Sequence, residues 1–394
     1  MILVTGGAGF IGSNFIYHLI QRKQEKIVIL DNFTYAANFE TIKPLIENKI
    51  CELVVGNIDD YNLLCDILNK FKPTAIVNFA AETHVDRSIL SPEKFISTNI
   101  FGTFRLLEAS RGYYEKLTSY EKAKFRFIHI STDEVFGSLE KDENSFTESS
   151  SYQPNSPYSA SKASSDHIVR SWYHTYKFPA IITNCSNNYG PYQFPEKLIP
   201  LIIINALNQE ALPIYGDGKQ IRDWLYVDDH CVALSLIIDR GHPGETYNIG
   251  GNCQITNLEV VTKICNILDE IKPLESNKSY NQLIKFVDDR PGHDRRYAIN
   301  SSKISSCFGV SIFFPEPQTE HASCLNVLTE ENSKFSKSID KNFSEDFGFV
   351  FGGNRCGCLD ASQTCRAHFR PARVFSGPKH DPTGGACYGG VCGT

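Results

Sequence analysis

The sequence has no run of 18 consecutive apolar residues, no surplus of positive charge and no basic segment ahead of its first apolar run. Without such an apolar run, we expect no membrane-spanning helix. The net charge is −6, so we expect no basic surface for nucleic acid or for an anionic membrane. The chain opens on MILVTGG, which argues against a secretory signal. These absences predict a cytoplasmic protein that binds neither nucleic acid nor membrane.

Cysteine is sparse in the first 300 residues and dense in the rest of the chain. Six cysteines occur singly before residue 300, whereas seven of the 13, with 11 of the 27 glycines, lie in the last 88 residues. Isolated cysteines are typical of small core or surface residues in a reducing compartment. The 394 residues, at roughly 100–200 per domain, suggest two domains and an appendage.

The first 185 residues alternate short apolar runs with amphipathic stretches. Apolar runs at residues 2–5, 27–30 and 75–79 are continuous rather than alternating, and residues 10–21 have helical spacing. Continuous apolar strands that alternate with helices predict a parallel sheet buried on both faces. Residues 186–300 are richer in Asn, Tyr, Pro and Gly, which favours a smaller α/β lobe with long loops.

A glycine-rich turn follows the first apolar run. Gly6, Gly9 and Gly12 stand in GGAGFIG, between the predicted strand and the predicted helix. Such a turn lets the backbone approach a pyrophosphate, which then meets the helix N-terminus. The second strand ends at Asp31, 19 residues after Gly12, where a carboxylate accepts the ribose hydroxyls of NAD and repels the 2′-phosphate of NADP. We therefore predict bound NAD rather than a glycine turn of another α/β protein.

Two further motifs carry chemistry. Tyr158 and Lys162 are four residues apart on a predicted helix and so share one face. Together with the glycine turn, this pair resembles the extended short-chain dehydrogenase/reductase superfamily, in which Tyr acts on a hydroxyl near NAD. A third strand ends at Thr132, Asp133 and Glu134. If this strand ends at the switch point of the sheet, the two neighbouring carboxyl groups have different pKa values. At an ordinary strand end, they would only begin a solvated loop.

Two carboxyl groups that ionise differently, as expected for Asp133 and Glu134, suit one reaction on a hexose. Oxidation of the C4 hydroxyl acidifies the C5 proton, which Glu134 removes as base while Asp133 protonates the departing C6 hydroxyl. Seven segments between residues 80 and 300 resemble the bacterial dTDP-glucose 4,6-dehydratase family, and the similarity runs nearly unbroken from residue 1 to about 304. They are AAETHVDRSI, HISTDEVFG, PYSASKA, NCSNNYGPYQFPEKLIP, PIYGDGKQIRDWLYVDDH, GETYNIGG and DRPGHDRRYAIN.

The resemblance implies roles for particular residues. Tyr158 is the C4 base, Lys162 its supporting cation, and Thr132 hydrogen bonds the C4 oxygen. The residues expected to hold NAD are Gly6, Gly9, Phe10, Ile11, Gly12, Asp31, Asn32, Asn57, Ile58, Ala80, Ala81, Tyr158 and Lys162. Those expected to hold dTDP-glucose are Thr83, Asn187, Lys197, Leu198, Pro213, Tyr215, Arg222, Asn248, Arg290 and His293. We expect no metal cofactor, and the resemblance implies a homodimer and a role in deoxysugar synthesis of the dTDP-rhamnose type.

The expected organisation has three parts. Residues 1–185 form a Rossmann-like, doubly wound NAD-binding domain, and residues 186–304 form a nucleotide-sugar lobe partly interleaved with it. Residues 305–394 form an atypical tail for which we expect disorder. This tail is a frame-shifted or mis-joined reading frame, a genuine extension, or a metal-binding module, although Cys356 and Cys358 have the wrong spacing for the last.

Two departures from the family leave other functions open. Asn57 stands where the family has Asp beside the adenine amino group, so we expect weaker NAD binding. The family's C-terminal helix is absent after residue 304. The alternatives are another NAD-dependent nucleotide-sugar dehydratase or epimerase or, because the C-terminal helix is replaced, an inactive remnant.

Overall fold

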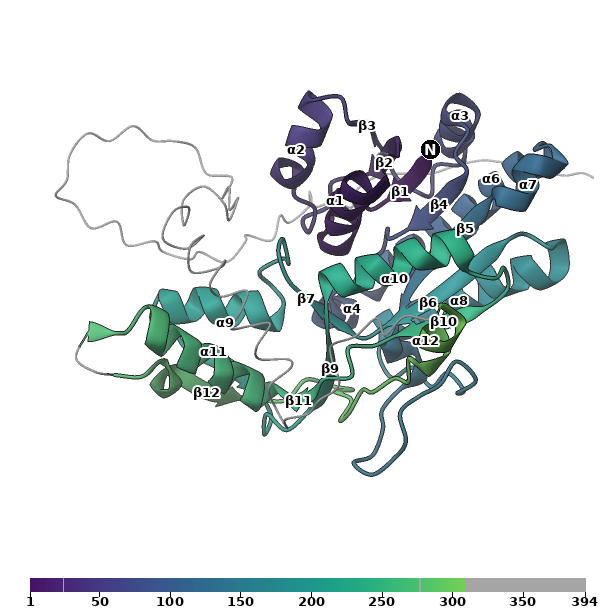
Figure 1. The fold of residues 1–394 in the computed structure, drawn as a ribbon. Coiled ribbons are helices and arrows are strands. Elements are labelled where there is room, and N and C mark those ends of the chain that lie inside the picture. Colours follow the sequence, from purple (N-terminus) through teal and green to yellow (C-terminus); the bar gives the residue numbers. More distant parts are fainter. Residues whose placement is uncertain (24, 276–277, 309–394) are drawn as a thin grey trace, which may run out of the picture. The chain divides into compact units, whose positions relative to one another are not determined.

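The computed structural model describes residues 1–23, 25–275 and 278–308. All of them belong to the first of two compact units, Met1–Phe349, and the predictions about the tail beyond residue 308 lie outside the described residues. A seven-stranded sheet forms the centre of this unit, in the order β10-β6-β5-β4-β1-β2-β3 (Figure 1). Every neighbouring pair is parallel. Its strands are β1 (Ile2–Thr5), β2 (Ile27–Asp31), β3 (Cys51–Val55), β4 (Ala75–Asn78), β5 (Arg126–Thr132), β6 (Ala180–Cys185) and β10 (Thr246–Ile249).

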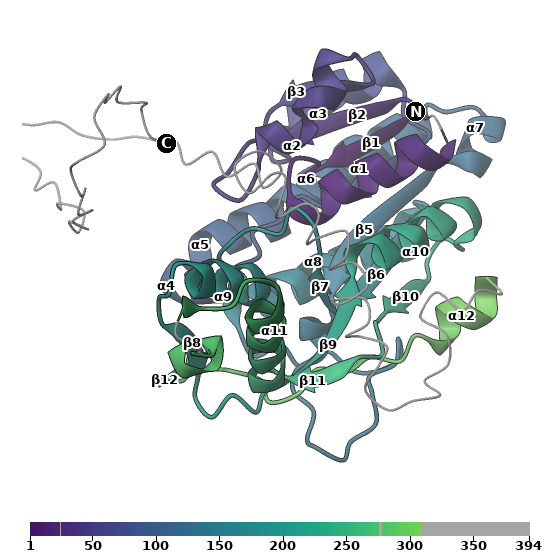
Figure 2. The same cartoon turned by 60° about the vertical axis from the view of Figure 1, so that its left-hand side comes forward.

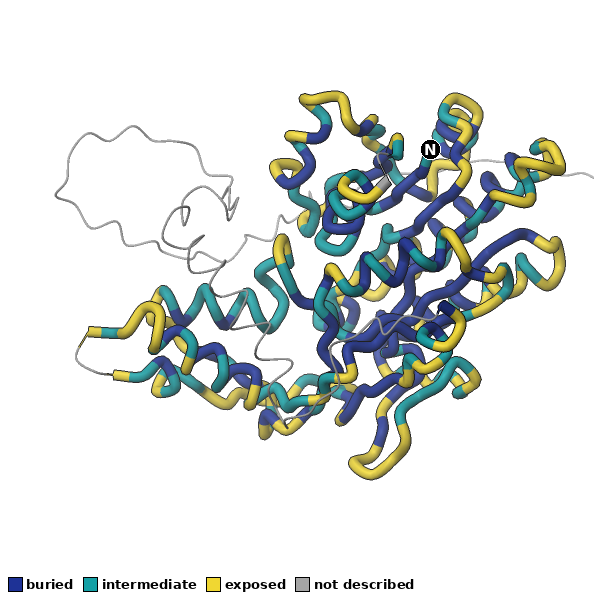
Figure 3. Tube along the Cα trace, in the orientation of Figure 1, coloured by how far each residue is buried: buried dark blue, intermediate teal, exposed yellow. Residues whose placement is uncertain are grey.

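Helices cover both faces of this sheet because its strands are apolar on both sides. Ile2 and Val4 pack in one core and Leu3 packs in the other, as the pleat of a strand requires. One core is closed by α1 (Phe10–Lys23), α2 (Phe39–Glu47), α10 (Val227–Arg240) and α12 (Ser302–Phe308). The other is closed by α3 (Tyr61–Phe71), α6 (Thr103–Glu115) and α8 (Pro157–Tyr176), and Figure 3 shows the strands between as buried. The predicted doubly wound fold is confirmed.

A smaller group of elements follows β6 in the chain. A three-stranded sheet has the order β11-β9-β7, and β12 pairs with β8. The strands are β7 (Asn187–Tyr189), β8 (Leu212–Tyr215), β9 (Ile221–Tyr226), β11 (Gln254–Thr256) and β12 (Ile284–Val287), and the helices are α9 (Leu198–Leu207), α11 (Asn257–Ile271) and η4 (Tyr280–Leu283). They enclose a separate apolar core, and Figure 2 shows α9 and α11 beside β8 and β12.

The chain returns from this group to the central sheet. β10 and α12 lie in the large sheet and its core, although both follow β9 in sequence. The helix α12 continues past residue 305, with Ile304 and Phe308 buried. The boundaries at residues 185 and 304 remain predictions. Among the described residues, no helix has the length and apolar character needed to cross a membrane.

The order of the sheet creates a switch point between β1 and β4, where the direction of strand addition reverses. Ligands of such sheets bind beyond the carboxyl ends of the strands at this point. The short elements near these ends are α4 (Val85–Leu90), α5 (Pro92–Phe95), the π-helix η1 (Ile96–Gly102) and the 3-10 helix η2 (Asp133–Phe136). The short helix α7 (Ser119–Lys124) precedes β5 and lies at the opposite edge of the sheet.

Candidate active site

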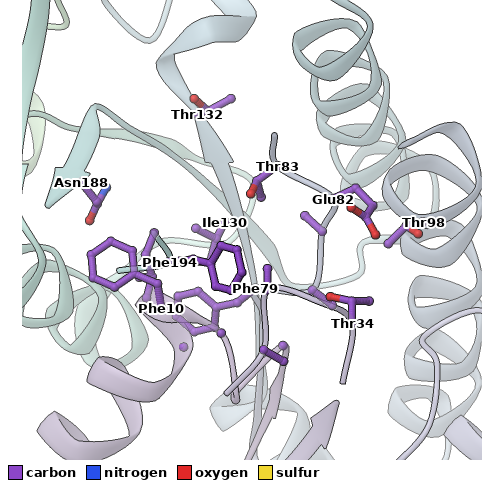
Figure 4. A pocket seen from close by; sticks show the side chains of 18 of the residues that line it. Phe10, Thr34, Phe79, Glu82, Thr83, Thr98, Ile130, Thr132, Asn188 and Phe194 are labelled. Atoms are coloured by element: carbon purple, nitrogen blue, oxygen red, sulfur yellow. The ribbon is translucent and has the colours of Figure 1, made fainter. Parts of the chain in front are cut away.

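A pocket lies at the carboxyl ends of β1, β2, β4, β5 and β6. Figure 4 shows the side chains of Phe10, Phe79, Phe194 and Thr132 among those that line it. Its lining includes every residue predicted from the sequence to hold NAD, contributed by loops that lie far apart in the chain. These residues are Gly6, Gly9, Phe10, Ile11, Gly12, Asp31, Asn32, Asn57, Ile58, Ala80, Ala81, Tyr158 and Lys162.

The glycine turn brings its backbone close to neighbouring backbone. Gly6 has φ +67°, and a Cβ there would lie 2.7 Å from the amide nitrogen of Ala80. A Cβ on Gly12 would lie 2.4 Å from the carbonyl oxygen of Gly6. The first turn of α1, at Phe10 and Ile11, lines the pocket and has backbone N–H groups without partners in the helix. This cradle fits a dinucleotide diphosphate.

Asp31, at the end of β2, organises the turn as well as facing the pocket. Its carboxylate accepts the backbone N–H groups of Ala8 and Phe33, each at 2.9 Å. Burial raises the pKa of Asp31, and these backbone hydrogen bonds oppose that rise. A carboxylate held in this way fits the adenosine ribose of a dinucleotide. The side-chain oxygen of Asn57 faces the N–H of Asp59 at 3.5 Å.

Tyr158 and Lys162 lie on the first turns of α8, which begins after a capping box formed by Ser156 and Ser159. Both side chains are buried, with 7% and 3% exposure. Nζ of Lys162 donates to the carbonyl oxygen of Ile130 at 2.8 Å. Burial lowers the pKa of Lys162 and raises that of Tyr158 well above its usual value.

Thr132 joins these groups to the two carboxyl side chains. Its hydroxyl accepts the backbone N–H of Glu134 and donates to Oδ1 of Asp133, both at 3.3 Å. Donation from the same hydroxyl to Tyr158 lowers the pKa of the phenol against the effect of burial. Because the hydroxyl has a single hydrogen, it donates to either Asp133 or Tyr158 at one time. The end of β5 therefore places one hydroxyl in contact with both functional motifs.

The environments of Asp133 and Glu134 differ. Asp133 is 1% exposed and lies outside the pocket lining, and its pKa is raised well above the usual value by burial, then by Glu134 and Asp223. Glu134 is half-buried and lines the pocket. Burial also raises its pKa, but Arg290 and Arg222 oppose that rise. The surroundings of Asp133 thus favour its neutral form, and Glu134 has nearby cations that favour its carboxylate.

Three of the residues predicted to hold the sugar nucleotide line the same pocket, namely Thr83, Asn187 and Lys197. Nζ of Lys197 donates to the carbonyl oxygen of Thr83 at 3.1 Å. Asn248 lies elsewhere, on β10, and donates to the carbonyl oxygen of Phe146 at 3.1 Å. The others outside the lining are Leu198, Pro213, Tyr215, Arg222, Arg290 and His293.

Arg222 is a buried cation that has carbonyl partners. Its guanidinium donates to the carbonyl oxygens of Ile221 at 2.8 Å and Asp294 at 3.1 Å, and it lies 4.3 Å from the ring centre of Tyr297. Burial lowers its pKa, with Glu134 acting in the opposite direction. A guanidinium can donate two parallel hydrogen bonds to an anionic ligand.

Arg290, Tyr215 and His293 form a second group at the edge of the smaller lobe. Arg290 and Tyr215 both donate to the carboxylate of Asp86, at 3.3 Å each. The rings of Tyr215 and His293 stand edge to face, 6.2 Å apart, and Nδ1 of His293 lies 2.5 Å from Asp289. Asp86 was absent from the sequence prediction, although it lies in the quoted AAETHVDRSI segment.

The sequence prediction also missed a buried network behind Lys162. Asp166 accepts hydrogen bonds from Ser131, Tyr152 and Asn184, and His129 lies between Asp166 and Lys162. The signal for Asp166 was present, because it follows Lys162 by the same four residues that separate Lys162 from Tyr158. Among the described residues, no group of three or more side chains is arranged to hold a metal ion.

A sequence model of the GDP-mannose 4,6 dehydratase family matches residues 3–311. The chain belongs to this family. Its sequence is 54% identical over 347 residues to dTDP-glucose 4,6-dehydratase 1 of Escherichia coli strain K12, which covers 86% of this chain and 94% of that protein.

Two solved structures of family members share the fold. The dTDP-glucose 4,6-dehydratase of Bacillus anthracis, solved with NAD, has a TM-score of 0.71 and 42% identity, covering 85% of this chain and 97% of that one. The dTDP-glucose 4,6-dehydratase of Streptomyces venezuelae, solved with NAD and TYD, has a TM-score of 0.73 and 39% identity, covering 86% and 97%. The suspected resemblance is confirmed at the level of the family.

Proposed function

We propose that this family member is an NAD-dependent hydro-lyase that converts dTDP-glucose to dTDP-4-keto-6-deoxyglucose and water. The observation that carries the proposal is the unequal pair Asp133 and Glu134, which follows β5 and contacts Tyr158 through Thr132. A dehydratase needs an acid and a base together, whereas a simple epimerase does not. The dTDP-glucose 4,6-dehydratases at 54% identity, and the related structures that contain NAD, support this choice.

Each residue has one proposed task. Tyr158, as phenolate supported by Lys162, takes the proton of the C4 hydroxyl, and Thr132 holds the C4 oxygen. NAD, held by the residues of the glycine turn and Asp31, would supply a reversible hydride acceptor for the oxidation at C4 and the reduction at C6. Glu134 removes the C5 proton and later returns it to C5. Asp133 gives its proton to the C6 hydroxyl, which leaves as water.

The proposed binding roles follow the sequence assignments. The first 185 residues hold NAD through the glycine turn, Asp31 and Asn57, and residues 186–304 hold the sugar nucleotide. The buried Arg222 and the partly exposed Arg290 contact the diphosphate, an assignment supported by the effect of both cations on the pKa of Glu134. Tyr215 stacks on thymine, and the remaining predicted contacts are Thr83, Asn187, Lys197, Leu198, Pro213, Asn248 and His293.

The test is an incubation of the purified full chain with dTDP-glucose. We expect the 4-keto-6-deoxy product, detected by mass spectrometry as a loss of one water. Parallel incubation with UDP-glucose measures substrate preference, and faster turnover of UDP-glucose would overturn the substrate assignment. A folded protein that binds NAD but releases no product from either sugar would instead indicate an inactive remnant.

We further propose a cytoplasmic homodimer that works in deoxysugar synthesis of the dTDP-rhamnose type. Six of the seven described cysteines, at positions 51, 65, 185, 231, 265 and 307, are free thiols, and Cys253 is disulfide-bonded. Leu90 on α4 is 85% exposed, and Ile96 and Phe101 on η1 are also exposed, so these helices offer an apolar surface to a second copy. Light scattering on the wild type and on Leu90→Glu tests the dimer; an equal mass for both proteins would contradict this surface.

A further inference from the structure

Lys162 faces a buried polar cluster for which the proposed reaction has no use. His129 on β5 and Asp166 on α8 form its centre, with 0% and 1% side-chain exposure. Nε2 of His129 lies 3.4 Å from Nζ of Lys162 and 3.4 Å from Oδ1 of Asp166. Since Asp166 follows Lys162 by four residues on α8, both side chains lie on the helix face that carries Tyr158.

The hydrogen bonds of His129 fix the position of its proton. Thr5 donates to Oδ1 of Asn78 at 2.6 Å, which leaves Nδ2 of Asn78 to donate to Nδ1 of His129 at 3.1 Å. The proton of the imidazole is therefore on Nε2, which faces the hydroxyl oxygen of Ser165 at 3.2 Å. Burial lowers the pKa of His129 to about 4. The ring is neutral at pH 7 and supplies no charge to Lys162.

The negative charge near Lys162 comes from Asp166. Oδ2 of Asp166 accepts from Ser131 at 2.7 Å, Tyr152 at 3.0 Å and Asn184 at 3.3 Å, a set of donors that suits an acceptor-only carboxylate. Asp166 raises the pKa of Lys162 against the larger effect of burial.

The other titratable groups near Lys162 carry no negative charge in this environment. Cys185 on β6 acts on Lys162 in the same direction as Asp166, but its own pKa is raised to about 12, so the thiol is neutral. Tyr158 on α8 also has a raised pKa and is neutral in the absence of ligand. His129 on β5 is neutral for the reasons above.

We propose that Asp166 is a positioning residue that keeps Lys162 protonated inside the buried site. An ammonium group buried without a counter-charge releases its proton, because the low-dielectric interior disfavours the charged form. The consequence for turnover rests on the proposed function, in which protonated Lys162 supports the phenolate of Tyr158. A neutral Lys162 would leave that phenolate without support.

The sign of a pH shift tests the role in turnover. The rate at which bound nicotinamide is reduced after mixing with dTDP-glucose is measured against pH for Asp166→Asn. We expect the acidic limb to move to higher pH by one unit or more, with at least a tenfold loss of rate at pH 7, because Tyr158 loses a cation. If Asp166 acted on Tyr158 directly, removal of its charge would move the limb to lower pH, and that result would overturn the proposal.

A matched control keeps the charge and removes one contact. Tyr152→Phe deletes the donor at 3.0 Å from Oδ2 of Asp166 and leaves the carboxylate in place. We expect its acidic limb to stay at the wild-type pH. A shift in Tyr152→Phe as large as that in Asp166→Asn would assign the effect to packing and would overturn the proposal.

Thermal melting tests the charge pair without any turnover. In the wild-type background we expect Asp166→Asn to lower the melting temperature, whereas in a Lys162→Met background the same change raises it, because Asp166 is then a buried carboxylate without a counter-charge. The same sign in both backgrounds would overturn the pairing. If Asp166→Asn does not fold in the wild-type background, the double variant is compared with Lys162→Met alone. A double variant that is no more stable than Lys162→Met would also overturn the pairing of Asp166 with Lys162. This cycle remains informative even if the protein has no dehydratase activity.

Discussion

Asp133 and Glu134 are consecutive residues, yet only Glu134 lines the pocket, whereas the carboxyl group of Asp133 is enclosed and bonded to the hydroxyl of Thr132. The difference arises because η2 begins at Asp133, so successive side chains leave the strand end in different directions. Burial and the neighbouring carboxylates raise the pKa of Asp133, whereas at Glu134 cations from the smaller lobe oppose the rise that burial causes. In the proposed reaction, this difference lets Asp133 act as the acid and Glu134 as the base.

Replacing each of these carboxyl groups separates the two tasks. We expect Glu134→Gln and Asp133→Asn each to lower kcat by about 10²–10⁴-fold, the range for loss of a general acid or base. Glu134→Gln also stops exchange of the C5 proton with deuterated solvent, whereas Asp133→Asn retains that exchange and blocks loss of water. The exposed Asp142→Asn is the control for a carboxyl-to-amide change. Retained C5 exchange in Glu134→Gln would contradict its role as base.

The carboxylate of Asp31 sets the choice between NAD and NADP in the proposed site. Asp31→Asn removes a charged acceptor worth about 1.5–3 kcal/mol, so we expect a roughly 10- to 100-fold rise in the Kd for NAD. The Kd for NADP falls relative to that for NAD, because the repulsion of its 2′-phosphate is lost. Calorimetric titration of both nucleotides measures the two constants, with the exposed Asp66→Asn as control. An unchanged ratio of the two constants would remove Asp31 from cofactor discrimination.

The nucleotide-binding half of the fold could be predicted from local sequence because its signals are local. The continuous apolar run at residues 27–30 is the strand Ile27–Asp31, and the helical spacing of residues 10–21 is the helix Phe10–Lys23. Both patterns depend on burial of the segment itself. The need for glycine at positions 6 and 12 could also be predicted. The close backbone contacts that Gly6 and Gly12 allow are made within the turn itself or with its neighbouring strand.

Contacts between distant segments could not be predicted in the same way. Arg290 bonds to Asp86, 204 residues away, and Arg222 bonds to the carbonyl of Asp294, 72 residues away, so neither partner has a pattern in the local sequence. The burial of the end of α12 also depends on a contact with a distant segment. The apolar pattern fades after residue 304, but Phe308 is buried because it meets Tyr247, with ring centres 5.5 Å apart.

Phe308 ties the end of the described chain to the main core. We expect Phe308→Ala to lower the free energy of unfolding by about 3–5 kcal/mol, the usual loss for a buried phenylalanine. Denaturant unfolding of the full chain measures the change, and the exposed Ser306→Ala on the same helix is the control. A loss below about 1 kcal/mol for Phe308→Ala would mean that α12 does not stabilise the core in solution.

Asp223, buried beside Asp133, makes stability depend on pH. Burial raises the pKa of Asp223 to about 7, above its value in an unfolded chain, so the folded protein binds more protons. Stability contributed by the protonated form is therefore present at low pH and is lost as pH rises from about 4 through 7.

The variant Asp223→Asn mimics the neutral form of this side chain. Its amide oxygen can still accept the backbone N–H of Cys253, which in the wild type donates to Asp223 at 2.8 Å. We expect this variant to melt several degrees above the wild type at pH 8 and at nearly the same temperature at pH 4, with the exposed Asp288→Asn unchanged at both. A melting difference that is equal at the two pH values would show that Asp223 does not titrate on folding.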